Sequence, residues 1–254
     1  MDEWRHKMVE QVSIVGRLTR WLVLGAASGA LAGLGGWVFL EGLDRVTRTR
    51  THHGWLLYLL PIAGLGLGLA YHHLGGRASR GNSLLIEQIH QPTEWVPRRM
   101  APMIVVGTWI THLFGGSAGR EGTALQLSGS LTDTMSGLLR LRADDRRIML
   151  VAALGGGFGA IFGVPLAGTV FALEVQSIGR IRYEAIAPTL TASIVGDRVV
   201  RSLGYHHHIW APLSVHLTPW LGLRLAVAGL CFGLAGAAFI ELAEGIKAAV
   251  GRLI

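Results

Sequence analysis

The stretch GGSAGREGTALQLSGS, residues 115–130, sets an arginine and a glutamate side by side among glycines, small polar residues and apolar residues. Its glycines disfavour a continuous helix, and the sequence becomes regular again only after Gly122. We therefore expect a helix to begin here. The first N–H groups of a helix have no partner within it, and the peptide dipole attracts negative charge to that end. The stretch predicts an anion-binding helix start that carries an acidic side chain.

The rest of the chain has the composition of a membrane protein. Half of its 254 residues are hydrophobic and only 15% are charged, and residues 21–40 carry no charge over a length that crosses a bilayer as a helix. Several apolar runs are short and interrupted by Gly or Pro, which is typical of transporters and channels. The predicted fold is all-α, a multi-pass protein of the cell membrane. We expect helices near residues 12–46, 55–74, 83–90, 98–114, 122–139, 144–158, 164–176, 184–202 and 219–250.

Basic residues gather between the apolar runs. We expect them to set the topology and to contact lipid headgroups rather than nucleic acid. The adjacent His206, His207 and His208 point in different directions in regular structure, so we expect no metal site, and no cofactor is expected either. No nucleophile, base and orienting group occur together, so an enzyme is not predicted. The basic residues are Arg77, Arg80, Arg98, Arg99, Arg140, Arg142, Arg146 and Arg147.

Two segments of the chain resemble each other. Residues 29–46 align with residues 229–246 as two glycine-rich helices that end in acids. Small residues at every fourth position also arise from helix packing, so chance similarity stays an alternative. If the repeat is real, residues 1–215 form one unit and residues 216–254 form the first helix of an incomplete second unit. The matched pairs include Gly29 with Gly229, Gly33 with Gly233, Gly36 with Gly236 and Glu41 with Glu241.

Glu121 turns the predicted anion site into a gate. Its ionised carboxylate takes the place of an anion at the helix start, whereas the protonated form loses that attraction and can swing away. Occupancy by an anion and by a proton are then linked. An ordinary ion pair between Arg120 and Glu121 is the alternative, although ionisable groups inside a membrane usually have a function.

Two motifs carry a family resemblance. GREGT with the following ALQLSGSLTD, residues 119–133, and GGFGAIFGVPLAGTVFALEV, residues 156–175, resemble the CLC family of chloride channels and anion/proton antiporters. The resemblance covers the first half of the family's fold, an inverted-repeat half with short broken helices. It implies that Glu121 is the external gate and that the backbone of Gly119, Arg120, Gly122 and Thr123 forms an outer anion cradle. It also implies a homodimer or a complementary second half.

A third match lies at RGNSLLIEQIH, residues 80–90. CLC proteins carry a serine that touches the central anion where this chain has Asn82, flanked by Gly81 and Ser83, which form the inner cradle. Asn82 and Thr123 resemble the fluoride/proton antiporter branch, and the Asn82 amide offers an N–H donor to a small, strongly hydrated ion. A plain helix cap is the alternative for Asn82, and the two roles are compatible.

The internal proton route stays open, because Val175 stands where chloride/proton antiporters of the family place a glutamate. The expected function is fluoride/proton antiport, with fluoride or chloride, protons and membrane lipid as partners. A chloride channel or chloride/proton antiporter is one alternative. The other is a transport-incompetent half or assembly partner. Thr123, Gln126 and Ser130 either line the ion path or satisfy neighbouring helices, and His112 is either a proton relay or a packed residue.

Overall fold

The computed structural model describes residues 2–175, 183–207, 216 and 218–251. It divides into two compact units, residues 1–207 and 208–254, and we describe each by itself. The described residues are helical and contain no strand. The α-helices of the first unit are α1 (Asp2–His52), α2 (Leu60–Ala70), α3 (Asn82–His90), α4 (Met100–Leu113), α5 (Arg120–Leu138), α6 (Ala143–Phe162), α7 (Pro165–Glu174) and α8 (Ile186–Ser202), and the second unit holds α9 (Pro219–Gly251).

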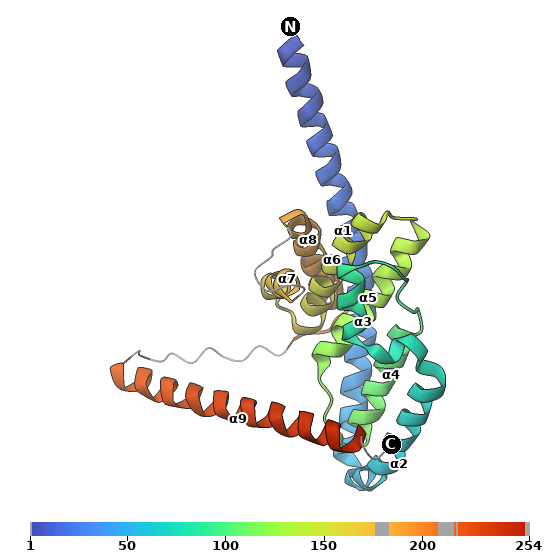
Figure 1. The fold of residues 1–254 in the computed structure, drawn as a ribbon, viewed down its shortest axis with the longest axis vertical. Coiled ribbons are helices and arrows are strands. Elements are labelled where there is room, and N and C mark those ends of the chain that lie inside the picture. The colour runs from blue at the N-terminus through green and yellow to red at the C-terminus, as the bar shows by residue number, and fades with distance from the viewer. Residues whose placement is uncertain (1, 176–182, 208–215, 217, 252–254) are drawn as a thin grey trace. The chain divides into compact units, whose positions relative to one another are not determined.

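Helices α1, α6 and α8 pack against one another and form the centre of the first unit. Helix α6 is buried nearly throughout and packs against α1, α5, α7 and α8 (Figure 1). Helices α1 and α8 meet through small residues: a Cβ at Gly29 would lie 2.8 Å from the Cα of Ala192. Glycine at this position therefore allows the two backbones to approach closely.

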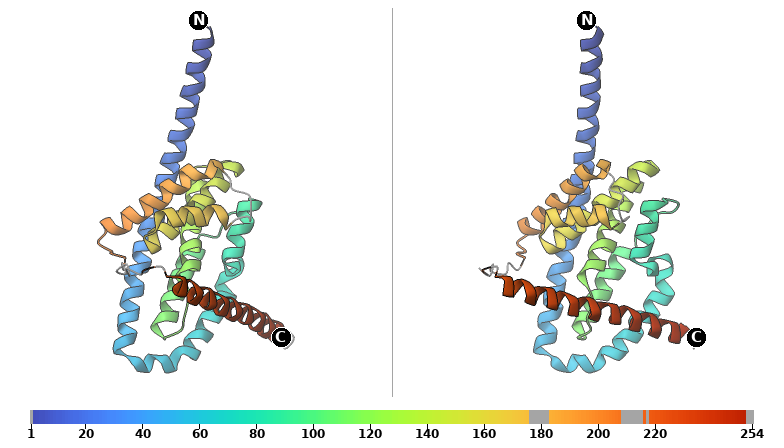
Figure 2. Two further views of the ribbon diagram at one scale, coloured as in Figure 1. Left: turned by 90° about the vertical axis from the view of Figure 1, so that its left-hand side faces the viewer. Right: turned by 60° about the vertical axis from the view of Figure 1, so that its left-hand side comes forward.

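Helix α6 runs through three successive glycines, Gly155 to Gly157, and ends at Phe162 with Gly163 as its C-cap. The helix continues because its glycines pack tightly: a Cβ at Gly155 would lie 2.5 Å from Thr189 Cγ2, so the packing that they permit outweighs their weak helix propensity. Gly163 adopts the left-handed conformation with φ 69°, and Pro165 then opens α7. Helices α7 and α8 both lie against α6 (Figure 2).

The expected helices are confirmed, with differences at their ends. The expected helix over residues 55–74 is divided into a 3-10 turn (Gly54–Leu59), α2 and a π-helical turn (Tyr71–Gly75), since Pro61 starts a new helix. A further 3-10 turn (Gly76–Arg80) leads into α3, and another (Tyr183–Ala185) leads into α8. Helix α6 extends beyond its expected end to Phe162.

Among the described residues, three helical segments are long and apolar enough to cross a membrane. Helices α4 and α7 are shorter apolar helices, as expected for broken elements. The expected division of the chain at residue 215 stays a prediction, and His208 lies outside the described residues. The three candidate spans are Ile14–His52, Gly54–His90 and Pro219–Ile246.

Candidate functional site

Helices α3 and α5 begin next to each other. A Cβ built on Gly122, in the first turn of α5, would lie 3.6 Å from Nδ2 of Asn82, the first residue of α3. A Cβ on Gly81, which precedes α3, would lie 3.2 Å from Nε2 of Gln126 in α5. The structure therefore brings together two segments that lie about forty residues apart in sequence, and the two anion cradles stay a prediction.

Glycine residues cap both helix starts. Gly81 has φ 56° and ψ −133°, a conformation that other residues rarely adopt, and Gly119 is extended with φ −70° and ψ 147°. Neither helix has a side-chain cap hydrogen bond. The proposed role of Asn82 as an N-cap is wrong, because Asn82 is the first helical residue and Gly81 is the cap. The Leu84 N–H donates to the Gly81 carbonyl oxygen over 3.2 Å, and the N–H groups that precede it in α3, like those that open α5, remain available to a ligand.

Helix α5 starts at Arg120, two residues earlier than expected, so Glu121 belongs to its first turn. The Glu121 carboxylate folds back over the helix start: a Cβ on Gly119 would lie 2.5 Å from Glu121 Oε2. Among the described residues, no ion pair links Arg120 to Glu121, and both side chains are exposed. The carboxylate therefore lies beside the N–H groups that an anion would use.

Arg120 lies near Tyr205, which follows the end of α8. Burial raises the pKa of the Tyr205 phenol, the nearby Asp44 carboxylate raises it further, and Arg120 lowers it. His112, on the helix before the glycine stretch, has its Nε2 3.0 Å from the carbonyl oxygen of Ala118. His112 thus ties the end of α4 to the segment that leads into α5, which favours its reading as a packed residue.

Two of the three polar residues expected on one face of α5 satisfy neighbouring elements. The Thr123 hydroxyl is buried and lies 2.9 Å from that of Thr108 on α4. The Ser130 hydroxyl donates to the carbonyl oxygen of Pro97 over 3.0 Å. Gln126 alone of the three reaches the starts of α3 and α5. The Thr123 side chain is thus engaged by α4, and Ser83, in the first turn of α3, is exposed.

A buried ion pair fixes the linker between α3 and α4, and the sequence analysis missed it. Arg146 Nε lies 2.6 Å from Oδ1 of Asp133, and the exposed fractions of the two side chains are 4% and 0%. Arg146 also donates to the Glu94 carbonyl oxygen over 2.5 Å and lies over the Trp95 ring. The expectation that Arg146 contacts lipid headgroups is wrong, because this side chain is buried against Asp133. The available signal was an aspartate in the interior of a helix whose other charged residues, Arg120 and Glu121, lie in its first turn.

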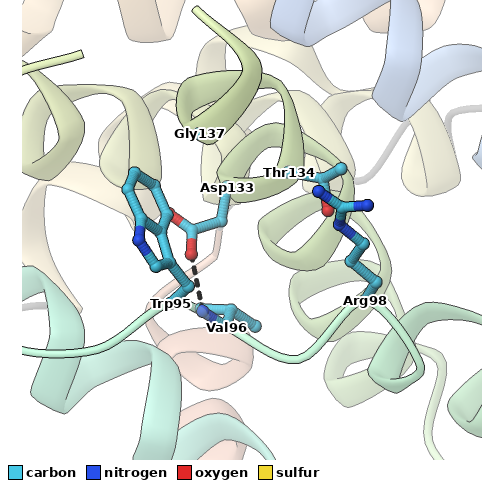
Figure 3. Close-up of a pocket in the computed structure, with 6 residues that line it drawn as sticks. All are labelled: Trp95, Val96, Arg98, Asp133, Thr134 and Gly137. Atoms are coloured by element: carbon cyan, nitrogen blue, oxygen red, sulfur yellow. Dashed lines mark hydrogen bonds between the residues drawn. The ribbon is translucent and has the colours of Figure 1, made fainter. Parts of the chain in front are cut away.

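The same linker borders a small cavity. Figure 3 shows Trp95 and Val96 of the linker beside Asp133 of α5, whose carboxylate accepts the Val96 N–H over 2.6 Å. Three other basic residues of the expected lipid-facing set also have acidic partners: Arg77 pairs with Glu94, Arg80 with Glu87 and Arg147 with Asp144. The cavity has a volume of about 220 Å³ and is lined by Trp95, Val96, Arg98, Asp133, Thr134 and Gly137.

Known proteins share these motifs. The sequence model of the voltage gated chloride channel family matches residues 63–254. A "Chloride/fluoride channel protein" of Pseudomonas syringae pv. tomato is 43% identical over 246 residues, covering 96% of this chain and 54% of the relative. An "H(+)/Cl(-) exchange transporter ClcA" of Yersinia pestis is 28% identical, covering 87% of this chain and 50% of the relative.

Solved structures agree in fold. The crystal structure of a CLC-type fluoride/proton antiporter superposes with a TM-score of 0.81 at 34% identity, covering 87% of this chain and 56% of that chain. A slow cyanobacterial Cl⁻/H⁺ antiporter superposes with a TM-score of 0.58 at 20% identity, which shows the shared fold alone. The chain spans about half the length of the relatives that it matches. With its family match extending over most of its length, the chain belongs to the voltage gated chloride channel family, whose members include the CLC antiporters.

Proposed function

We propose that this chain forms part of a CLC-type anion transporter of the cell membrane, and that it supports fluoride/proton antiport gated by Glu121. The observation that carries the proposal is the Glu121 carboxylate, which lies over Gly119 at the start of α5, while Gly122 of the same turn lies next to Asn82 at the start of α3. The two first turns direct positive partial charge toward one place. An anion and the carboxylate compete for that place.

Proton coupling follows from this competition. The ionised Glu121 carboxylate accepts from the first-turn N–H groups and excludes an anion. When a proton binds to the carboxylate, its charge is lost, the side chain leaves, and the N–H groups can donate to an anion. Release of the anion lets the carboxylate ionise and return. Each cycle therefore links one protonation of Glu121 to a change in anion occupancy.

The preference for fluoride is supported by the donors at the site. Asn82 supplies a side-chain N–H where a serine would supply a hydroxyl, and the relatives include a chloride/fluoride channel protein and a fluoride/proton antiporter structure. A small ion of high charge density requires many close donors when it loses its water. Chloride transport is the alternative, supported by the chloride exchangers among the relatives.

The remaining proposals concern assembly. We propose that residues 1–215 are the first CLC repeat and that residues 216–254 begin the second, so that transport takes place in a homodimer or with a complementary second half. Val175 caps the end of α7 after the exposed Glu174, and the proposed cycle uses neither of them. A transport-incompetent assembly partner is the competing possibility.

The test measures fluoride and chloride efflux from proteoliposomes with ion-selective electrodes, together with proton movement. The proposal expects faster efflux of fluoride than of chloride, and Glu121→Gln is expected to abolish fluoride-driven proton movement. Glu184→Gln, which changes an exposed acid elsewhere, serves as the control. Coupled transport that survives in Glu121→Gln would refute the gate. If neither ion moves unless a second half is supplied, the chain alone is incompetent, and the assembly-partner reading is correct.

A further inference from the structure

The Gln126 side chain occupies the gap between the two helix starts. Its Nε2 lies 3.2 Å from the position of a Cβ on Gly81 and 3.7 Å from that of a Cβ on Gly122. Gly81 thus stands at the start of one helix and Gly122 in the first turn of the other, and a single amide approaches both. Gln126 comes four residues after Gly122, so the two residues lie on the same face of α5.

Asn82 brings a second amide to the same point. Asn82 Nδ2 lies 3.6 Å from the Cβ position of Gly122, so both amide nitrogens come within 3.7 Å of one place. Among the described residues, neither side-chain amide has a hydrogen-bond partner, and Gln126 is partly buried. A partly buried amide that lacks a partner in the protein is available to donate to a ligand.

We propose that Gln126 is an anion-binding and specificity-determining residue, which donates its amide N–H together with Asn82 to an ion held between the starts of α3 and α5. This inference rests on the proposed function, because it assigns a further residue to the same anion site. The two amides add side-chain donors to the backbone N–H groups of the first turns. They favour fluoride over chloride, since the smaller ion loses more hydration energy and therefore depends more on each donor.

The glycine at position 81 supports this role. Any larger residue there would place its Cβ against the Gln126 amide, and the positive φ of Gly81 already disfavours other residues. The approach of α3 to α5 thus leaves space for the Gln126 side chain at the helix starts. A purely structural glutamine would instead be expected to hydrogen-bond to α3, and no such bond is present among the described residues.

The experiment titrates the purified chain with sodium fluoride and then with sodium chloride by isothermal calorimetry, in a Glu121→Gln background where the gate carboxylate does not compete. Gln126→Leu is expected to weaken fluoride binding roughly tenfold or more, as for loss of a hydrogen bond to a charged group. Chloride binding is expected to weaken less. Gln91→Leu, which removes an exposed glutamine from the α3–α4 linker, is the matched control and is expected to bind like its parent.

The outcomes separate this inference from the proposed function. If the Glu121→Gln parent binds neither halide, both fail. If the parent binds fluoride and Gln126→Leu binds it equally well, or if the fluoride-to-chloride preference does not fall, only the role of Gln126 is overturned. Should Gln126→Leu misfold by circular dichroism and gel filtration, Gln126→Glu decides, because it keeps the side-chain length and its ionised form has no donor.

Discussion

Replacing Arg146 by methionine would show what the buried ion pair contributes. The two side chains form parallel contacts, Nε to Oδ1 at 2.6 Å and Nη2 to Oδ2 at 2.9 Å, with exposed fractions of 4% for Arg146 and 0% for Asp133. Arg146→Met leaves the Asp133 carboxylate buried with the Val96 N–H as its remaining donor. Removing one partner of a buried pair costs about 3–5 kcal/mol of unfolding free energy.

The assay is unfolding in mixed detergent micelles, followed by circular dichroism. Arg45→Met is the control, because Arg45 pairs with Glu41 while its side chain is 71% exposed, and such a pair contributes less than about 1 kcal/mol. The double variant Asp133→Leu/Arg146→Met is expected to lose less stability than the two single variants together, since it leaves no buried charge unpaired. The reasoning is refuted if Arg146→Met costs no more than Arg45→Met, or if the single effects simply add.

Three further predictions concern a helix contact, a titrating group and a turn. Gly29→Ala is expected to lose about 1–3 kcal/mol of unfolding free energy, because its Cβ would press on the backbone of α8, whereas Gly64→Ala in α2, with no atom within 4 Å of its Cβ, is expected to lose none; thermal melts that agree for the two variants would contradict this. Burial lowers the pKa of His207 against the opposing effect of Asp197. Below pH about 6.5 the unfolded chain therefore binds more protons than the folded chain, and the free energy of unfolding is expected to fall as the pH falls. His207→Gln should flatten this pH dependence in thermal melts recorded across pH, and an unchanged slope would contradict the role of His207. Gly81→Ala is expected to cost about 1–3 kcal/mol of unfolding free energy through its positive φ, and also to weaken fluoride binding by displacing Gln126. The same calorimetric titration measures this against the Glu121→Gln parent, and unchanged affinity would show that the Gln126 position is irrelevant.

Much of the fold was predictable from local pattern. Runs of apolar residues gave the expected helices α3, α4 and α8 within two residues of their observed ends, because hydrophobic length and Gly or Pro punctuation are local properties. The end of α6 was predicted wrongly. A run of glycines normally weakens a helix, but here it permits close contact with α5 and α8, and this tertiary packing outweighs the local preference.

The two segments that form the candidate site could be predicted from the sequence, but their arrangement in space could not. The motif around Glu121 and the match at Asn82 indicate both helix starts from the sequence alone. Their adjacency, and the position of Gln126 between them, depend on the packing of α3 against α5. The sequence offered two roles for Thr123 and Ser130, and their hydroxyl partners on α4 and on the linker favour packing for these two side chains.

The sequence by itself determined that this chain is a membrane protein in which some apolar helices are short, and that Glu121 stands at a helix start. These conclusions depend on composition and on residues adjacent along the chain. Only the tertiary structure decided that Asp133 and Arg146 pair out of contact with solvent, and that Gln126 reaches Gly81. The separation of these residues along the chain does not predict how close they lie in space, because helix packing depends on the shape of whole helix surfaces.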